Sequence, residues 1–306
     1  MKNAIMTMTT AATMLCLSAA VHAGVRYSKY DTPFMPKSAP AARAAVEVSV
    51  MPGKNMPLVA AKINGKACTL LFDTGATHTT LDAGFMQREL PDVPLVDVLL
   101  GGMTNVKAAP KLAHIASLEL GEAKFCDFDA MVLDLADMAR GIGANIVGVI
   151  GMNVIGSAPV IVSLGAGKAV FAPDAGDVAG FGKGIARYVD EPMSVALTPI
   201  YNGRMFPIIV DSGATMTFLD KTLGWPSSGE KVDIGAVHVN GHSGLAAERG
   251  LTGKLTLGED VELSPMLIDQ RASSIGSDVL LSYDILIDRE QARFRKRSKS
   301  PAHLAP

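Results

Sequence analysis

The chain contains the same phrase twice: residues 70–82 read LLFDTGATHTTLD, and residues 208–220 read IIVDSGATMTFLD. Seven of the thirteen positions are identical, and the copies lie 138 residues apart in a chain of 306. This offset suits two domain-sized units and is far longer than the repeat of a solenoid. The sequence therefore predicts two similar units in one chain.

The sequence around each copy predicts short strands. Apolar runs flank Asn64-Gly65 in the first unit and Asn202-Gly203 in the second, and Asn-Gly is a strong hairpin signal. In both units the hairpin ends on the aspartate of the phrase, and a glycine-rich stretch, a second hairpin and a closing apolar run follow. Many short strands separated by turn residues indicate a mostly β fold.

The chain divides into five predicted segments. Residues 1–23 resemble a secretory signal, because Lys2 precedes an apolar stretch and Val21-His22-Ala23 fits a cleavage site. The other segments are a flexible lead-in, two lobes and a disordered tail, predicted at residues 24–45, 46–180, 181–297 and 298–306. A membrane anchor is the alternative for the first segment, but its threonines make it a poor one. We expect an exported protein, periplasmic or secreted, without stable membrane insertion.

Composition narrows the function classes. Hydrophobic residues make up 48% of the chain and charged residues 19%, which is enough apolar material for real cores. The net charge of −2 gives no reason to expect a nucleic acid partner. Signal removal would leave two cysteines, Cys68 and Cys126, which either form a disulfide or remain two unpaired thiols.

The repeated aspartate suggests a reaction that needs two carboxyl groups. Asp73 and Asp211 each follow an apolar strand and precede a tight turn. If the units pack about a pseudo-twofold axis, the two carboxyls can meet and share one proton. The ionised member then takes a proton from water as the water attacks a carbonyl, and the protonated member donates to the carbonyl oxygen. One aspartate could not perform both roles, so the pattern predicts amide hydrolysis without a metal.

The two Asp-Thr/Ser-Gly-Ala-Thr motifs resemble those of aspartic proteases, particularly the retropepsin-like branch, which has Ala after the Gly. The run Val149-Ile150-Gly151 resembles the hydrophobic-hydrophobic-Gly element of that family. The resemblance implies two β-barrel-like lobes related by a pseudo-twofold axis, as in pepsin-like enzymes. It also implies a monomeric aspartic endopeptidase that acts on proteins or peptides with Asp73 and Asp211 as its catalytic pair. No cofactor is expected.

The resemblance implies further roles. Thr74 and Ser212 would lock the two loops together through their hydroxyl groups. The other expected supporting residues of these loops are Gly75, Thr77, Gly213 and Thr215. The glycine-rich stretches would be flaps over the cleft, with Gly101, Gly102 and Met103 in the first and Asn240, Gly241 and His242 in the second. The closing run of the second unit is taken as Leu280-Leu281-Ser282, with Ser where the family has Gly, which predicts altered packing behind Asp211.

Other residues invite other interpretations. His78 corresponds to Met216 in the second copy, so a packing or surface role is expected. His238 and His242 have a spacing that suits a metal only on a helix, and no metal site is predicted. Asp82 and Asp220 are expected to begin the helix or turn after each motif. A binding or inhibitor protein that kept this fold and lost catalysis is the alternative function, although both aspartates are intact.

Overall fold

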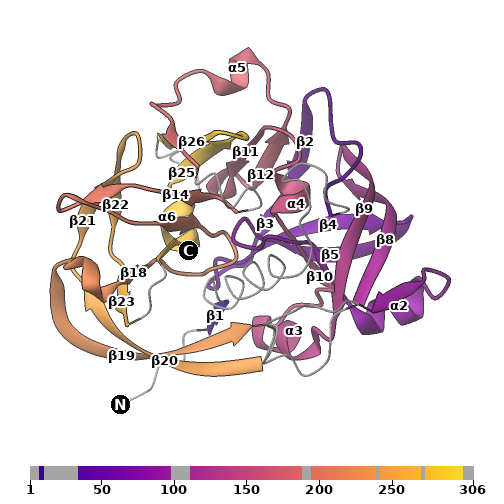
Figure 1. Cartoon of the computed structure of the whole chain (residues 1–306), viewed down its shortest axis with the longest axis horizontal. Helices are drawn as coiled ribbons and strands as arrows, with labels where there is room; N and C mark the ends of the chain where they lie inside the picture. Colours follow the sequence, from indigo (N-terminus) through magenta and orange to yellow (C-terminus); the bar gives the residue numbers. More distant parts are fainter. Residues whose placement is uncertain are drawn as a thin grey trace.

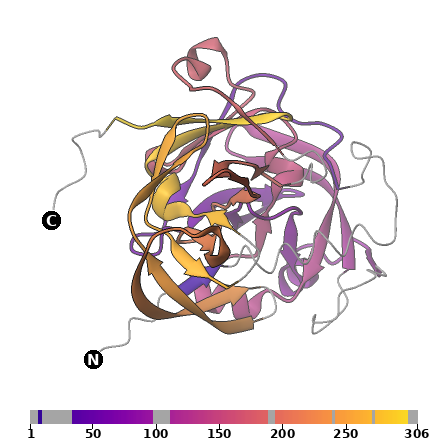
Figure 2. The ribbon, with the colours of Figure 1, turned by 60° about the vertical axis from the view of Figure 1, so that its left-hand side comes forward.

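The computed structural model describes residues 7–9, 34–97, 111–187, 194–238, 241–269 and 273–298. The described chain is mostly β, as predicted, and its two halves lie side by side around a shared sheet (Figure 1). In the turned view the first half lies on the right and the second half on the left, and helix α5 (Ala175–Val178) projects from the body (Figure 2).

The first half forms a closed barrel of six strands. Pairing of β4 with β8 at Lys62↔Glu119 and Ile63↔Leu118 closes the ring. In order around the barrel the strands are β4 (Pro57–Ile63), β5 (Lys66–Phe72), β10 (Gly148–Ile150), β6 (Thr80–Asp82), β9 (Ala123–Leu133) and β8 (Lys111–Leu120). The remaining elements of this half are β3 (Ser49–Val50), β7 (Leu95–Asp97), α2 (Ala83–Glu89), α3 (Ala136–Ile142) and α4 (Met152–Ile155). Alternate residues of β4 are buried, as expected for a strand with one face toward a barrel core.

The second half repeats the strand order. Strands β17, β24, β18, β23 and β20 follow one another as β5, β10, β6, β9 and β8 do in the first half. Its main sheet contains β14 (Ala196–Leu197), β17 (Ile208–Val210), β24 (Ser274–Ile275), β18 (Phe218–Asp220), β23 (Met266–Ile268), β20 (Gly241–Gly250) and β19 (Ser227–His238). The smaller elements are β15 (Ile200–Tyr201), β16 (Arg204–Met205), η2 (Lys221–Leu223), β21 (Gly253–Thr256), β22 (Asp260–Leu263) and α6 (Ser277–Leu280). Strand β1 (Thr7–Thr9), in the segment predicted as a signal, pairs in parallel with β19.

Both predicted Asn-Gly hairpins are present. Asn64 has φ 47° and Gly65 φ 84°, and Asn202 has φ 49° and Gly203 φ 73°. Positive φ at both central residues gives the tight turn whose twist matches that of the flanking strands, and Asn and Gly tolerate this conformation best. The turns join β4 to β5 and β15 to β16. The first hairpin ends directly before Asp73, as predicted, whereas the second ends at Met205 and the separate strand β17 leads to Asp211.

A six-stranded sheet joins the halves. Its order is β2 (Ala44–Glu47), β12 (Lys168–Phe171), β11 (Val160–Ser163), β25 (Tyr283–Ile287), β26 (Gln291–Lys296) and β13 (Ile185–Ala186), and a 3-10 turn, η1 (Leu164–Ala166), links β11 to β12. The first three strands come from the first half and the last three from the second, in mirrored order. At the centre β11 and β25 run antiparallel with Ile161 opposite Leu286. This arrangement is the pseudo-twofold relation that the repeated phrase predicts.

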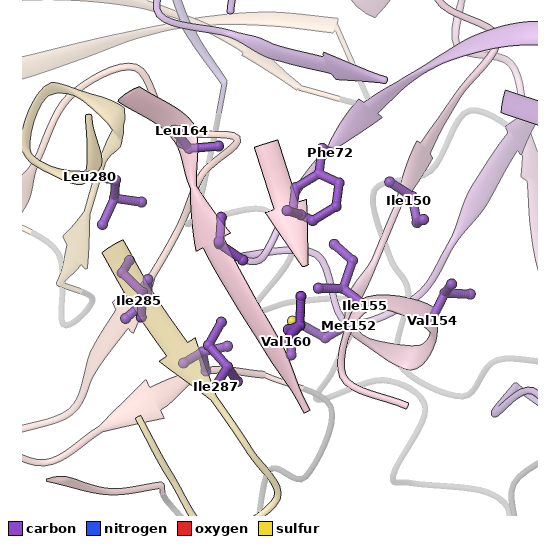
Figure 3. Packing of buried hydrophobic residues seen from close by; sticks show 14 of the residues in the cluster. Phe72, Ile150, Met152, Val154, Ile155, Val160, Leu164, Leu280, Ile285 and Ile287 are labelled. Carbon is purple, nitrogen blue, oxygen red and sulfur yellow. The ribbon is translucent and has the colours of Figure 1, made fainter. Parts of the chain in front are cut away.

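One apolar cluster runs beneath both phrases. Phe72, Ile150 and Val160 come from the first half, and Leu280 and Ile285 come from the second. Figure 3 shows these side chains in the same region of the core. The strands that carry the aspartates and the shared sheet are therefore packed as a single body, which holds the two loops at a fixed separation.

The predicted lead-in needs correction at its end. Phe34 is only 5% exposed, the Lys37 amide donates to the Cys126 carbonyl at 3.0 Å, and strand β2 begins at Ala44. Residues 34–45 therefore lie against the first half and do not form a free linker. The chain passes from one half to the other between β12 and β13. Residues 10–33 and 299–306, which hold most of the predicted signal and tail, lie outside the described residues.

Of the two alternatives for Cys68 and Cys126, the structure shows the unpaired thiols and not the disulfide. Cys68 lies on β5 and Cys126 on β9, and strands β4 and β8 stand between them in the barrel. The two strands are therefore opposite each other in the ring, and six spacings of about 4.8 Å give a ring about 9 Å across, which exceeds the Cα separation of about 4.4–6.8 Å that a disulfide allows. Among the described helices none is long and apolar enough to cross a membrane.

Candidate active site

Two strands deliver the two aspartates in the same way. Strand β5 ends at Phe72 and strand β17 ends at Val210, and each aspartate follows directly. The Asp73 amide donates to the Ile150 carbonyl at 3.1 Å, and the Asp211 amide donates to the Ile275 carbonyl at 2.9 Å. Each loop therefore begins on a buried strand whose neighbour, β10 or β24, runs parallel to it.

The closing run behind Asp211 is not the one predicted from sequence. The Met152 amide donates to Ala76 O at 2.7 Å, and its counterpart is the Ser277 amide, which donates to Ala214 O at 2.8 Å. The residue that corresponds to Gly151 is therefore Gly276. The prediction of Leu280-Leu281-Ser282 with a missing glycine is wrong, because the second half has a shorter path between the motif and this element. The offset between the halves falls from 138 residues at the aspartates to 125 at these glycines.

Both glycines of the closing runs are required by close packing. A Cβ on Gly151 would lie 2.6 Å from the His78 carbonyl carbon, and one on Gly276 would lie 2.8 Å from the Met216 nitrogen. Such distances are too short for any side chain. The element behind each loop is therefore pressed against the backbone of the repeated phrase in both halves.

The glycines of the two motifs are explained by the opposite loop. A Cβ on Gly75 would overlap the carboxyl group of Asp211, and one on Gly213 would overlap that of Asp73. Neither residue has a positive φ among the described backbone angles. The need for glycine comes from close approach between the two loops, and not from a special turn conformation.

Thr74 and Ser212 join the loops by four hydrogen bonds. The Thr74 hydroxyl donates to the Val210 carbonyl at 2.7 Å and accepts from the Ser212 amide at 3.0 Å. The Ser212 hydroxyl donates to the Phe72 carbonyl at 2.7 Å and accepts from the Thr74 amide at 2.9 Å. Both side chains are buried. The predicted hydroxyl hydrogen bonds between the loops are thus present, and they are symmetric.

Asp73 and Asp211 lie together in this frame. The two carboxyl groups lie close enough for each to perturb the pKa of the other, and both residues are at most 4% exposed. Burial raises the pKa of both above the ordinary value, because a buried carboxylate loses its hydration. For Asp211 the negative charge of Asp73 adds to burial and holds the pKa well above that value.

The backbone donors around the pair are unequal. Asp73 Oδ1 accepts from the amides of Gly75, Ala76 and Gly213 at 2.8, 3.2 and 3.2 Å, which lowers the pKa of Asp73 against the effect of burial. Asp211 Oδ1 accepts from the Ala214 amide at 2.9 Å, whereas its Oδ2 is buried without a hydrogen-bond donor among the described groups. These hydrogen bonds favour negative charge on Asp73 more than on Asp211.

The remaining predicted residues are placed as follows. The Thr77 hydroxyl lies 2.8 Å from His78 Nδ1 in the core, so His78 has the expected packing role. Thr215 is half-buried just after Gly213 in the second loop. Asp82 accepts from the Phe85 amide at 2.8 Å and Asp220 from the Thr222 amide at 2.9 Å, so both begin the next helical turn, as predicted.

The flap predictions are placed only in part. Gly101, Gly102, Met103 and Asn240 lie outside the described residues. The stem of the first stretch is the antiparallel pair β7–β8, and the stem of the second is the long hairpin β19–β20, in which Gly241 pairs with His238 and His242 with Val237. This long hairpin reaches α3 of the first half (Figure 1). Among the described residues no three potential ligands are grouped to hold a metal ion.

Sequence reasoning missed a second layer of contacts. The Thr79 hydroxyl and amide both donate to Asn153 Oδ1, at 2.9 and 2.7 Å, and the Thr217 hydroxyl donates to Asp278 Oδ1 at 2.8 Å. The two threonines occupy equivalent places in the repeated phrase, a signal available in the sequence. Their partners follow Gly151 and Gly276 by two residues, which becomes evident only once Gly276 is assigned correctly.

Residues 59–154 match a family model described as aspartyl protease. The matched segment runs from β4 to α4 and contains the Asp73 loop and Gly151, but it covers less than half of the chain. A comparison with curated proteins gives no match. These findings support an aspartic protease family for the first half. The likeness of the second half rests on the repeat that the structure displays.

Proposed function

We propose that the protein is an exported, monomeric aspartic endopeptidase that hydrolyses peptide bonds with water activated by Asp73 and Asp211. One observation carries the proposal: two buried carboxyl groups lie beside each other where two equivalent loops meet. A pair that shares a proton contains a base and an acid in one site. The aspartyl protease match on residues 59–154 supports the same reaction class.

The unequal surroundings assign the two roles. The ionised Asp73 takes a proton from water while the water oxygen bonds to the carbonyl carbon of the substrate. Asp211 donates its proton to the carbonyl oxygen, which gives a neutral tetrahedral diol and leaves the negative charge on Asp211. The proton on Asp73 then passes to the amide nitrogen, a diol hydroxyl returns a proton to Asp211, and the C–N bond breaks. The products are an acid and an amine, and the pair regains its starting state.

The test is cleavage of denatured casein by the purified chain, with fragments identified by mass spectrometry over pH 3–8. Asp73→Asn and Asp211→Asn should each abolish cleavage, because each removes one of two proton-transfer roles that cannot substitute for each other. Asp92→Asn is the matched control, since Asp92 is exposed and lies outside both motifs. Full activity in either dyad variant would place the chemistry elsewhere.

The alternative of a binding or inhibitor protein with this fold has a distinct outcome. Such a protein would bind a peptide with the same affinity in the wild type and in the asparagine variants and would cleave nothing. Export is tested separately by N-terminal sequencing of the protein from its host, which should begin at Gly24 if the predicted signal is removed. The molar mass measured by analytical ultracentrifugation tests whether the protein is a monomer.

A further inference from the structure

The segment 34–43, which we call the strap, contacts the Asp73 loop directly. The Phe34 ring packs edge-on against His78, with ring centroids 4.4 Å apart, and the Phe34 carbonyl accepts from Asn153 Nδ2 at 2.6 Å. Both residues that Phe34 contacts belong to the layer behind Asp73. The site described above does not account for this contact, because the strap lies outside both copies of the repeated phrase.

Two short chains of contacts run from Phe34 to the loop. In the first, His78 Nδ1 is 2.8 Å from the Thr77 hydroxyl. In the second, Asn153 uses its oxygen for the Thr79 amide and hydroxyl, and the Thr79 hydroxyl accepts from the Gly151 amide at 3.2 Å. Asn153 is fully buried, and its side-chain amide hydrogen-bonds to both segments: Nδ2 to the strap and Oδ1 to the loop.

The far end of the strap is also fixed. The Lys37 amide donates to Cys126 O, Ser38 and Cys126 are paired by an isolated bridge, and Arg43 Nε lies 2.7 Å from an Asp177 carboxylate oxygen. The exposed Arg43 ion pair adds little by itself. Backbone pairing at both Lys37 and Ser38 nevertheless holds Phe34 in place against the first half.

Among the residues that the structure describes, the second half has no equivalent contact. Met216 corresponds to His78, and Asp278 corresponds to Asn153. A carboxylate keeps the threonine hydrogen bond but has no N–H group with which to hold a peptide carbonyl. Asp278 is also exposed, whereas Asn153 is covered. The strap is therefore a feature of the Asp73 loop alone.

We propose that Phe34 is a positioning residue for Asp73, and that the strap is an essential part of the active enzyme. This proposal deepens the proposed function and rests on it. Removal of a signal after Ala23 leaves the strap intact, whereas trimming beyond Phe34 would release the layer that holds Thr77 and Thr79. Displacement of a catalytic group by about 1 Å can cost roughly 100-fold in rate, so such trimming would inactivate a chain that still folds.

The experiment compares Phe34→Ala with Phe34→Leu and with the control Phe181→Ala. Phe181 is half-buried against Arg295, whose guanidinium carbon lies 4.2 Å from the ring centroid, and it does not contact the Asp73 loop. We expect kcat of Phe34→Ala to fall about 10- to 100-fold with KM changed by less than about threefold, because orientation and not binding is lost. Phe34→Leu should recover most of this loss.

Hydrogen exchange gives a readout that does not need activity. Amides of residues 73–81 should exchange on the order of tenfold faster in Phe34→Ala and unchanged in Phe181→Ala. A kcat equal to that of Phe181→Ala after correction for folded fraction, or unchanged exchange at residues 73–81, overturns the positioning role. If the wild type cleaves nothing, the proposed function fails, and the exchange comparison still decides whether the strap holds the loop.

Discussion

Replacing Thr74 with Val tests whether the hydrogen bonds between the loops hold the halves together. Val has nearly the same shape as Thr and lacks the hydroxyl, so the change removes two buried hydrogen bonds and little packing. Each such bond contributes about 0.5–1.5 kcal/mol net, and each buried group left without a partner costs about 1–3 kcal/mol. The Val210 carbonyl and the Ser212 amide would lose this partner, so we expect a loss of about 2–6 kcal/mol.

Urea unfolding of the wild type, Thr74→Val and Thr69→Val measures the change. Thr69 is a half-buried threonine on β5, in the strand that leads to Asp73, and its side chain makes no hydrogen bond to the described part of the chain. Thr69→Val should change the free energy of unfolding by less than about 0.5 kcal/mol. A similarly small change for Thr74→Val would refute the structural role assigned to this hydroxyl.

The double variant Thr74→Val/Ser212→Ala sharpens this test. The two hydroxyls make four separate hydrogen bonds and share none. Independent losses would add to about 4–12 kcal/mol, which is comparable with the whole stability of many proteins. If the loops separate as a unit once the first hydroxyl is gone, the second change costs less than its single value. A loss in the double variant that is smaller than the sum of the two single losses would therefore show that the four hydrogen bonds form and break together.

Three further predictions concern the same region. The folded-state pKa of Asp211 is raised above its ordinary 3.8, so protonation of Asp211 stabilises the fold fully below about pH 4, and this stabilisation is lost as the pH rises through the raised pKa. Asp211→Asn should remove this loss of stability. Thermal unfolding of the wild type and the variant from pH 3 to 8 measures the difference. Gly75→Ala should abolish cleavage, because the added Cβ would displace the Asp211 carboxyl. Gly244→Ala is the control for the substitution itself: a Cβ at Gly244 has open space, so the unfolding temperature should not change. Burial raises the pKa of Cys68 to about 11. At pH 8 this thiol should therefore react with iodoacetamide far more slowly in the folded than in the unfolded chain. Equal rates would contradict the partly buried position of Cys68.

The repeated phrase was enough to predict the class of fold and the meeting of two carboxyls. Seven identical positions in the two copies show which residues are equivalent. Because a strand ends on Asp in both copies, two similar units that pack together bring the two aspartates to the same interface. The Asn-Gly pairs likewise predict hairpins, because few other residues accept two consecutive positive φ angles. Local sequence thus decides features whose physical cause is local.

Features that depend on distant contacts could not be predicted in this way. Gly276 was overlooked because its role comes from the backbone of Met216, which lies 60 residues earlier, and because the path to it is shorter than in the first half. The composition of residues 24–45 suggested a flexible segment, but the partners of Phe34 lie at positions 78 and 153. The two cysteines could be separated only once the strand order of the barrel was known.

The most consequential unpredicted feature is the asymmetry of the pair. The two motifs share Asp, Gly, Ala and Thr, so the sequence gives no reason for a proton to prefer one carboxyl. In the folded chain the Gly213 amide of the second loop donates to Asp73, the aspartate of the first. Asp73 thereby has three amide donors, whereas Asp211 Oδ1 accepts from the Ala214 amide and lies beside the charge of Asp73. A symmetric frame thus gives the two carboxyls unequal surroundings, because one donor crosses between its halves.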